Sequence, residues 1–437
     1  MSDPHQIIIV GGGAGGLELA TRLGGRLGRR RRASITLVDR NRTHVWKPLL
    51  HEVAAGSMDI HTHQLDYLAQ ARWHHFSFCC GALESLDRWR REITVAPALD
   101  EGGVEVIPRR VLRYDTLVLA VGSVTNSFGV PGVAEHAFAL DSADEADRFQ
   151  GRLVNACLRA NYRGSKDHSS HLHVVIVGGG ATGVELAAEL HNTARVLAAY
   201  GLENIDPERY VRLSLVNADA RILAQLPERI SDATAAILEE LGVNVLNGEQ
   251  VVEVSDREVR TKSGKLLPAD LTVWAAGIKG ADFLGGLGGL ETNRLNQFVV
   301  TPTLQTTRDP DIFAIGDCAA CPWDGHAMPV PPRAQAAHQQ ASHLFKAIGR
   351  QMRGRPLKPF RYRDFGSLVS LGEYSTVGSL MGFLSGKSLR VEGWFARLMY
   401  ISLYKLHLLA LHGVLGVALD TLARFLKRGT EPRVKLH

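Results

Sequence analysis

Two glycine-rich stretches carry the residues whose spacing points most directly to chemistry. Each follows a short apolar run and has the pattern G-x-G-x-x-G, formed by Gly11, Gly13 and Gly16 in the first copy and by Gly178, Gly180 and Gly183 in the second. The first glycine permits a tight turn, the second lets the backbone approach a pyrophosphate, and the third allows close packing of helix on strand. The N–H groups that open the helix then point at the phosphates. The sequence therefore predicts two dinucleotide-binding loops.

The residue that ends the next apolar run differs between the two copies. In the first copy this residue is Asp39, whose carboxylate can accept hydrogen bonds from both hydroxyls of an adenosine ribose. In the second copy it is Asn217, which can bond a ribose hydroxyl but does not repel a 2′-phosphate, and Arg221 follows closely. The choice between NADH and NADPH therefore stays open, as does a plain turn role for Asn217.

Two dinucleotide sites in one chain indicate two cofactors between which electrons pass. A flavin beside a nicotinamide is the common reason, because hydride can move from one ring to the other. Asp317, at the end of the apolar run in AIGD, is well placed to bond a ribityl hydroxyl of FAD. We therefore expect FAD in one site and a nicotinamide nucleotide in the other.

Glu185 lies in the helix that opens at Gly183, within the second copy. A carboxylate near the start of a helix also suits the positive helix end, so a simple dipole role stays open. Glu18 occupies the matching place in the first copy, and we expect it to be structural.

The stretch PPRAQAAHQQ predicts a helix that begins just after Pro331 and Pro332. The backbone N–H groups near Gln335 and Ala336 then fall in its first turn, where negative charge such as that of an anionic reduced flavin is stabilised. Gln335 and Gln339 are four residues apart and so share one helix face. Two amides on one face can hydrogen-bond a quinone carbonyl, although a polar surface face is the alternative.

Cysteine and histidine usage argues against disulfide and metal chemistry. Five cysteines are too few for a disulfide framework, and the odd count fits a reducing compartment. Cys318 and Cys321 form C-A-A-C after Asp317, but we expect an inert pair rather than a redox dithiol. None of the 18 histidines has convincing metal-ligand spacing, so no metal is predicted.

The elements that position these residues predict an α/β, doubly wound architecture with two Rossmann-like domains. Apolar strands, glycine loops and helical segments recur along the chain. YDTLVLAVGS (114–123) has a counterpart in ADLTVWAAGI (269–278), each following its own glycine loop. DIFAIGDCA (311–319) comes after both, so we expect a return to the first domain, with the second domain inserted into it.

The expected domain boundaries follow from this pattern. They are 1–128 and 291–356 for the two parts of an FAD domain, 129–290 for an NADH domain, and 357–437 for a C-terminal region. Within the last region, GSLVSLGEYSTVGSL (366–380) alternates around glycines and predicts a small antiparallel sheet.

The C-terminal segment after Trp394 is apolar and basic, although the formal charge of the whole chain is only +5. Its longest apolar run, 406–419, is short of the roughly 20 residues that span a bilayer. Leu415, Leu419, Leu422 and Leu426 recur at helical spacing, opposite Asp420, Arg424 and Lys427. With Trp394, Tyr400 and Tyr404 as interfacial aromatics, this pattern predicts a monotopic membrane anchor. A dimer interface or core packing stays open.

The run Arg29–Arg32 is interpreted as a solvated helix end, and no nucleic-acid partner is expected.

Several stretches together resemble bacterial type II NADH:quinone oxidoreductases, the respiratory NADH dehydrogenases that pump no protons. They are IIIVGGGAGGLELA, ITLVDRNRTHVWKPLLHEVAAGSMD, VVIVGGGATGVELAAELH, TVWAAGIK, TPTLQTTRDPDIFAIGDCAACP, PPRAQAAHQ and the tail ending in PRVKLH. The glycine motifs alone indicate only the wider flavoprotein superfamily. The likeness covers essentially the whole chain.

This resemblance implies that hydride passes from NADH to N5 of a non-covalently held FAD, which then delivers two electrons to a membrane quinone. It also implies a peripheral position on the cytoplasmic face of the bacterial inner membrane, and a homodimer is possible. The FAD contacts implied are Gly11, Gly12, Gly13, Ala14, Gly15, Gly16, Asp39, Arg40, Lys47, Leu83, Ala120, Gly122, Asp317, Gln335 and Ala336. The NADH contacts implied are Gly178, Gly180, Ala181, Thr182, Gly183, Asn217, Ala276 and Gly277. The catalytic residues implied are Glu185, Gln335 and Gln339. Asn217 departs from the resemblance, since related enzymes often have Glu there.

Two other functions are weighed against this one. A sulfide:quinone oxidoreductase needs paired reactive cysteines at the flavin, and Cys157 with Cys318 are the only remote candidates. An NADH-binding redox sensor needs no quinone site, and the glutamine face and apolar tail count against it.

Overall fold

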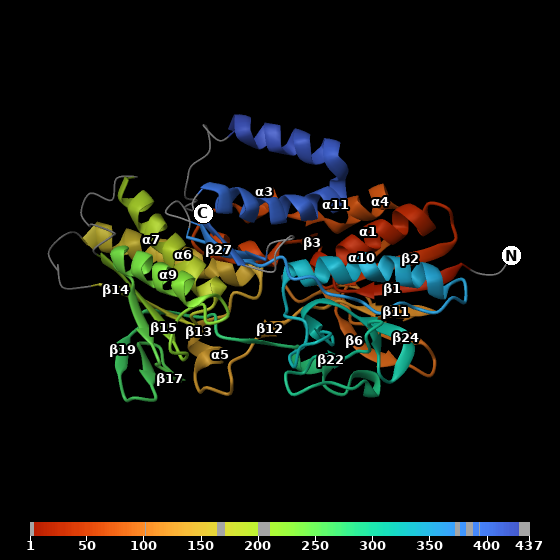
Figure 1. Ribbon diagram of the computed structural model, residues 1–437, viewed down its shortest axis with the longest axis horizontal. Coiled ribbons are helices and arrows are strands. Elements are labelled where there is room, and N and C mark those ends of the chain that lie inside the picture. The colour runs from red at the N-terminus through yellow and green to blue at the C-terminus, as the bar shows by residue number, and fades with distance from the viewer. Residues whose placement is uncertain are drawn as a thin grey trace.

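The computed structural model describes residues 4–100, 102–163, 171–199, 210–371, 376–381, 388–392 and 394–427. These residues form two α/β units side by side, with the C-terminal helix lying across one side of both (Figure 1).

The first unit is built on a six-stranded sheet in the order β23-β24-β11-β1-β2-β5. Its strands are β1 (His5–Val10), β2 (Ala33–Asp39), β5 (Ser77–Cys80), β11 (Thr116–Leu119), β23 (Gln305–Thr306) and β24 (Asp309–Ala314). All neighbours pair in parallel except β23 with β24. Helices α1 (Ala14–Leu23) and α10 (Ala334–Gln351) pack against one another on this sheet. The central strands are continuously apolar because helices and loops bury both faces of the sheet.

The second unit has a five-stranded parallel sheet in the order β13-β20-β14-β15-β16. Its strands are β13 (Ala137–Phe138), β14 (Leu172–Val177), β15 (Val211–Asn217), β16 (Asn244–Asn247) and β20 (Leu271–Trp274). Its helices are α6 (Ala143–Arg163), α7 (Ala181–Ala199) and α9 (Glu228–Glu240). The register repeats that of the first unit, since Ile9 lies opposite Val118 and Ile176 lies opposite Val273. Parallel-sheet Rossmann-like units were expected from the sequence, and they are confirmed.

The duplication extends to a three-stranded antiparallel sheet in each unit. The strands are β6 (Leu83–Asp87), β7 (Glu92–Val95) and β10 (Arg110–Arg113) in the first, and β17 (Val251–Val254), β18 (Glu258–Thr261) and β19 (Leu266–Pro268) in the second. The chain crosses between the units on two strands that pair with each other, β12 (Val124–Thr125) and β21 (Ile278–Lys279). β24 then joins β11, so the first sheet is completed after the second unit.

Shorter elements complete the two units. They are η1 (Gly24–Gly28, a π-helix), β3 (Thr43–His44), η2 (Lys47–Leu49), α2 (Leu50–Ala54), α3 (Ile60–His63), β4 (Leu65–Asp66), α4 (Tyr67–His74), β8 (Ala98–Leu99), β9 (Glu105–Ile107), α5 (Val133–His136), η4 (Asp282–Leu284), η5 (Leu287–Gly289), β22 (Phe298–Val299), η6 (Gly316–Cys318) and β25 (Ala319–Ala320). Of these, α2 crosses the boundary between the units: Leu50, Val53 and Ala54 pack in the core of the second unit. α2 therefore packs on α6 and α7 of the second unit.

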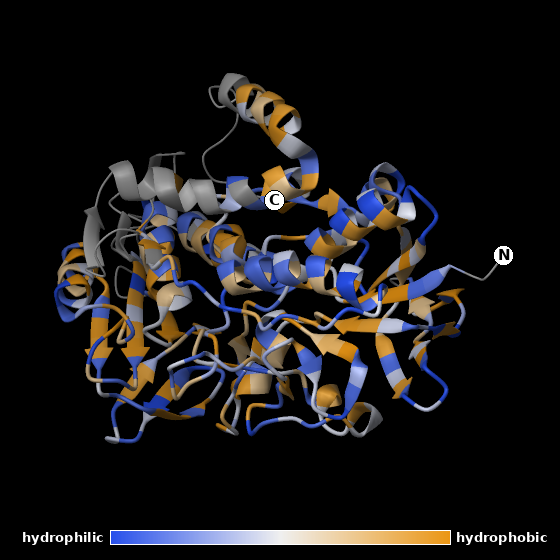
Figure 2. Cartoon of the chain, turned by 45° about the vertical axis from the view of Figure 1, so that its right-hand side comes forward, coloured by the Kyte–Doolittle hydropathy of each residue, from blue (hydrophilic) through white to orange (hydrophobic). Residues whose placement is uncertain are grey.

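The C-terminal region contains the small antiparallel sheet that the sequence predicts. Its strands are β26 (Ser367–Ser370), β27 (Thr376–Met381) and β28 (Ser388–Glu392). The final helix, α11 (Trp394–Lys427), is broken at Gly413, whose φ of 70° and ψ of 176° are not helical. We call residues 394–412 the docked leg and 414–427 the distal leg. The distal leg stands away from the body (Figures 1 and 2).

The docked leg corrects part of the membrane-anchor prediction. His407, Leu408 and Leu411 are buried, Leu411 in the core of the first unit, and the Tyr404 ring lies tilted against Trp46 with ring centroids 6.1 Å apart. Core packing, the alternative left open by the sequence, therefore describes this leg. The side chains of Trp394, Tyr400, Asp420, Arg424, Leu426 and Lys427 lie outside those described. Among the described residues, no helix is long and apolar enough to cross a membrane.

Glu18 fixes α1 to α10. Its side chain is fully buried, with Oε1 accepting a hydrogen bond from Arg22 (2.9 Å) and Oε2 lying 2.6 Å from Nδ1 of His338. Ser342 lies at 3.5 Å from the same carboxylate. The hydrogen bond with Glu18 raises the pKa of His338 above its ordinary value. The structural role expected for Glu18 fits these contacts.

We expect the stability provided by the Glu18–His338 pair to depend on pH. A raised pKa in the folded state means that the contribution is complete below the unfolded pKa, about 6.5, and is lost as pH rises through the folded value. His338→Gln should therefore lower Tm more at about pH 6 than at about pH 9. His343→Gln on the same helix is the control, because burial lowers the pKa of His343 and should give the opposite trend. Equal losses of Tm at both pH values for His338→Gln would contradict this role.

Candidate dinucleotide and redox site

The first glycine loop has the geometry that a pyrophosphate requires. Gly11 has a φ of 101°, and a Cβ on Gly16 would lie 1.9 Å from the Gly11 carbonyl oxygen, so neither position accepts a side chain. A Cβ on Gly13 would meet nothing within 4 Å, so the backbone there is open to a ligand. The helix α1 begins immediately afterwards, at Ala14. The cradle therefore fits the phosphates of a dinucleotide.

Asp39 ends β2 beside this loop, as the sequence predicts. Its Oδ2 accepts a hydrogen bond from the Gly12 N–H at 2.6 Å, and its Oδ1 accepts one from Asn41. Burial raises the pKa of Asp39, while these two backbone hydrogen bonds oppose the rise. Arg40, the next residue, is exposed.

Two aromatic side chains that the sequence analysis missed hold the other side of Gly12. The Gly12 carbonyl accepts a hydrogen bond from the Tyr67 hydroxyl at 2.8 Å and lies 2.9 Å from Nδ1 of His44. Because a carbonyl only accepts, Nδ1 of His44 carries the proton and its Nε2 is left as an acceptor. Nε2 of His407, on the docked leg, lies 3.0 Å away and is therefore the donor. Burial lowers the pKa of His44 to about 4 and that of His407 to about 2, which keeps both rings neutral.

The second loop repeats the cradle of the first. Gly178 has a φ of 118°, and a Cβ on Gly183 would lie 2.0 Å from the Gly178 carbonyl oxygen. A Cβ on Gly180 would meet nothing within 4 Å. The helix α7 begins at Ala181 and takes in Thr182. This loop therefore also fits a pyrophosphate.

Asn217 ends β15 beside the second loop, where Asp39 lies in the first. Its amide donates to the carbonyl of Asp219 and to Oδ1 of Asn247, both at 3.1 Å, and a Cβ on Gly179 would lie 2.6 Å from its Cγ. Asn217 is therefore in contact with the loop, which is more than a turn residue requires. Arg221 donates to the carbonyls of Leu226 and Ala224, so its guanidinium holds its own loop.

In both units a second turn packs against the first glycine of the loop. It follows β11, the neighbour of β1, in the first unit and β20, the neighbour of β14, in the second. A Cβ on Gly11 would lie 2.3 Å from the Ala120 carbonyl oxygen, and one on Gly178 would lie 2.8 Å from the Ala276 nitrogen. Gly122 and Gly277 both have positive φ angles, 75° and 65°. The predicted cofactor contacts Ala120, Gly122, Ala276 and Gly277 therefore lie in the turns beside the two glycine loops. Leu83 differs, because its side chain is buried in the core of the first unit.

Lys47 and Asp317, predicted separately as FAD contacts, meet through Ser123. Nζ of Lys47 donates to the Ser123 carbonyl at 3.0 Å and to Oδ1 of Asp141 at 2.9 Å. The Ser123 hydroxyl donates to Oδ2 of Asp317 at 2.9 Å. Burial raises the pKa of Asp317. Ser123 and Asp141 were not singled out from the sequence, since nothing in their local pattern marks them.

Glu185 lies where three parts of the chain meet. Its Oε1 accepts a hydrogen bond from the Ser370 N–H of β26 at 3.0 Å, and its Oε2 lies 3.5 Å from Nδ1 of His51 on α2. Both side chains are almost fully buried, and burial lowers the pKa of His51 to about 4. Within the described part of the chain, Nε2 of His51 has no hydrogen-bond partner. Glu185 therefore has tertiary partners and is more than a helix-dipole residue. His51 was missed because it lies 134 residues earlier in the sequence.

The structure gives the two glutamines of α10 partners that the sequence did not anticipate. The helix begins at Ala334, as expected, with Gln335 and Gln339 on one face and Ala336 buried. The Gln335 amide donates to the Gly366 carbonyl (2.9 Å), and the Gln339 amide donates to that of Arg363 (2.8 Å). Their side-chain oxygens accept from the N–H groups of Phe365 and Arg363. Both amides therefore hold the extended segment that follows α10, and the quinone contact expected of them stays a prediction.

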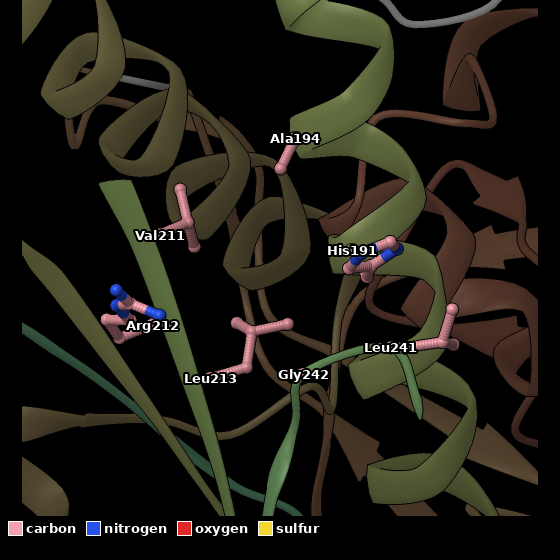
Figure 3. Close-up of a pocket in the computed structure, with 7 residues that line it drawn as sticks. All are labelled: His191, Ala194, Val211, Arg212, Leu213, Leu241 and Gly242. Atoms are coloured by element: carbon pink, nitrogen blue, oxygen red, sulfur yellow. The ribbon is translucent and has the colours of Figure 1, made fainter. Parts of the chain in front are cut away.

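A small hollow in the second unit is not part of this site. It is lined by His191, Ala194, Val211, Arg212, Leu213, Leu241 and Gly242 (Figure 3). The β15 residues among them open the strand, whereas Asn217 and the glycine loop lie at its other end. Ligands of such sheets bind at the carboxyl ends of the strands, so the hollow has no role in dinucleotide binding.

Comparison with known proteins identifies the family. The family model described as pyridine nucleotide-disulphide oxidoreductase matches residues 5–341. A type II NADH:quinone oxidoreductase of Haemophilus influenzae is 44% identical over 444 aligned residues, which cover 99% of each chain. The chain belongs to the type II NADH:quinone oxidoreductase family. NDH2 of Plasmodium falciparum, solved in complex with NADH, is 20% identical and matches 98% of this chain and 99% of its own with a TM-score of 0.78.

The fold alone does not separate type II NADH:quinone oxidoreductases from sulfide:quinone oxidoreductases. The sulfide:quinone oxidoreductase of Aquifex aeolicus matches 98% of this chain and 96% of its own, with a TM-score of 0.72 at 16% identity. The cysteines do separate them, because Cys157 is buried in the core of the second unit and Cys318 in that of the first. All five cysteines are free. The pairing that sulfide chemistry requires is therefore not present between these two residues.

Proposed function

We propose that this protein oxidises NADH and passes the two electrons to a quinone, with FAD as its resident cofactor. The observation that carries the proposal is the position of Glu185, which follows the second dinucleotide loop and contacts His51 of the first unit. Glu185 thus links the helix that follows the second loop to α2 and to β26. The name and the 44% identity of the Haemophilus influenzae relative support the same function.

The first loop supplies the groups that would hold FAD. The open backbone at Gly13 and the start of α1 would receive the pyrophosphate. The Asp39 carboxylate, which accepts the Gly12 N–H in this structure, would accept hydrogen bonds from the ribose hydroxyls. Lys47 and Asp317, which follow strands at the same carboxyl edge of the sheet or lie beside it through Ser123, would bond the remaining polar groups. When bound, FAD accepts hydride from NADH and gives up electrons to a quinone one or two at a time.

The second loop receives NADH, and Glu185 handles protons. Gly180 and the start of α7 take the nucleotide phosphates, and Asn217 contacts the adenosine ribose. Quinone reduction consumes two protons, which a titratable group at the site can relay from bulk water. The Glu185 carboxylate can do so at Oε2, beside a His51 ring that burial keeps neutral.

The distal leg of α11 supports a position on the membrane surface. Its Val414, Leu415, Leu419 and Leu422 side chains are all more than half exposed. An exposed apolar helix face on a leg that stands off the body suits insertion into the interfacial layer of a bilayer. We place the protein on the cytoplasmic face of the bacterial inner membrane, where its quinone is dissolved.

Stopped-flow spectroscopy tests the proposed function. Mixing the FAD-loaded protein with NADH should bleach the flavin absorbance, and a second mix with a short-chain quinone should restore it. NADPH serves as the comparison, because Asn217 carries no negative charge that would repel its 2′-phosphate. Bleaching by sulfide but not NADH, or slow reoxidation that does not saturate with quinone, would contradict the proposal.

We expect Cys318 and Cys321 to be dispensable for turnover. Both thiols are buried, and burial raises the pKa of each to about 12, so almost no reactive thiolate forms near neutral pH. The double Cys318→Ser, Cys321→Ser protein should therefore keep NADH:quinone activity within about twofold of the unchanged protein. Activity lost while FAD is retained would show that the pair takes part in electron transfer.

A further inference from the structure

Helix α4 presents an apolar, aromatic and basic face that nothing in the described chain covers. Tyr67, Gln70 and Ala71 point inward and are buried. On the outer face Leu68 is 65% exposed and Trp73 is 61% exposed, with Arg72 between them. Asp66 caps the start of the helix by accepting a hydrogen bond from the Ala69 N–H. The helix is therefore well defined at its N-terminus, and its exposed aromatic face is not a frayed end.

The C-terminal end of α4 adjoins the break in α11. His74, at this end, hydrogen-bonds the Leu411 backbone, and Leu411 and His412 are the last residues before Gly413; burial lowers the pKa of His74, and His412 lowers it further. In Figure 1, α4 lies beside that break, on the side of the molecule from which the distal leg rises. The end of α4 and the start of the distal leg are therefore neighbours, although 340 residues separate Trp73 from Gly413.

Positive charge lies near the same C-terminal end of α4. The carbonyl oxygens of His74 and His75 pack directly under Gly24 and Gly28 of η1, where an added Cβ would approach each to 2.2 Å. η1 leads straight into Arg29–Arg32, and all four arginines are exposed. The sequence analysis interpreted Arg29–Arg32 as a solvated helix end. In the structure these arginines follow η1, which packs on the end of α4, so their positive charge lies near the exposed apolar residues of that helix.

We propose that α4 and Arg29–Arg32 form a second membrane contact, for a bilayer with anionic headgroups. Tryptophan and leucine suit the apolar layer just below the headgroups, and arginines suit the negatively charged surface above it. The inference rests on the membrane association proposed above and adds a site in the first unit. Two contacts from distant parts of the chain fix how the molecule is tilted on the bilayer, which one helix alone does not.

Vesicle binding by the FAD-loaded, full-length protein tests this contact. Leu68→Ala with Trp73→Ala should weaken partitioning onto phosphatidylcholine–phosphatidylglycerol vesicles about tenfold. Arg29→Glu with Arg30→Glu should weaken it by roughly tenfold or more on those vesicles and little on pure phosphatidylcholine. Trp89→Ala is the matched control: Trp89 is 93% exposed between Arg88 and Arg90, in the turn between β6 and β7. It should bind like the unchanged protein.

Fluorescence quenching by brominated lipid gives a second measurement with milder substitutions. Trp73→Phe should remove part of the quenchable emission, and Trp89→Phe should not. If the unchanged protein binds vesicles but the α4 variants bind equally well, the α4 contact is wrong and association through the distal leg stands. If the unchanged protein does not bind vesicles, both fail. If the α4 variants change only self-association, the face belongs to a second copy of this chain and the proposal is overturned.

Discussion

Replacing Glu185 by glutamine should slow quinone reduction about a hundredfold while leaving FAD content unchanged. The amide can still accept the Ser370 N–H, which lies 3.0 Å from Oε1 of Glu185, so the contact with β26 survives. It cannot take up or release a proton beside His51. The loss should therefore appear in kcat at saturating quinone rather than in cofactor binding or in KM for NADH.

The control for this variant is Glu18→Gln, the matching position in the first copy. Glu18 pairs with Arg22 and His338 in the contact between α1 and α10, so its loss should lower Tm and leave kcat nearly unchanged. Steady-state rates with a soluble quinone, together with flavin absorbance, separate the two effects. An unchanged kcat for Glu185→Gln at saturating quinone would rule out the proton role.

Ending the chain after His412 should release the protein from membranes. This deletion removes Val414, Leu415, Leu419 and Leu422, whose exposed side chains suit an apolar layer. Losing their burial in lipid should weaken vesicle partitioning about a hundredfold. Turnover with long-chain quinones should fall in parallel, and turnover with short-chain, soluble quinones should persist.

The position of this cut follows from the structure. A cut near residue 390 would also remove His407, Leu408 and Leu411, which are buried, and would confuse detachment with damage to the fold. With the docked leg kept, Tm and FAD content should stay near those of the full chain. A shortened protein that still sediments with vesicles would show that the distal leg is not the main attachment.

The duplicated part of the fold could be predicted because its signals are local. A glycine pattern, an apolar strand on each side and the residue that ends the second strand lie within about 40 residues, and both copies have the expected geometry. Asp39 is an example, since the strand that contains it places it at the loop regardless of the rest of the chain.

The contacts that sequence reasoning missed join residues far apart in the chain. Tyr67 and His44 reach Gly12 across 55 and 32 residues, and no local pattern distinguishes them from ordinary core aromatics. The amides of Gln335 and Gln339 were correctly placed on one face, but their partners depend on an extended segment with no periodicity. The tail was misjudged in part because hydropathy does not distinguish a helix buried in protein from one buried in lipid.

The hydrogen-bonded chain from His407 through His44 to the Gly12 carbonyl makes the tail and the nucleotide loop thermodynamically linked. We expect a ligand that orders the loop to favour seating of the docked leg, and detachment of that leg to weaken binding of the ligand by the same free energy. With the proposed flavin bound, the distal leg should therefore be held more firmly in place than in the flavin-free chain.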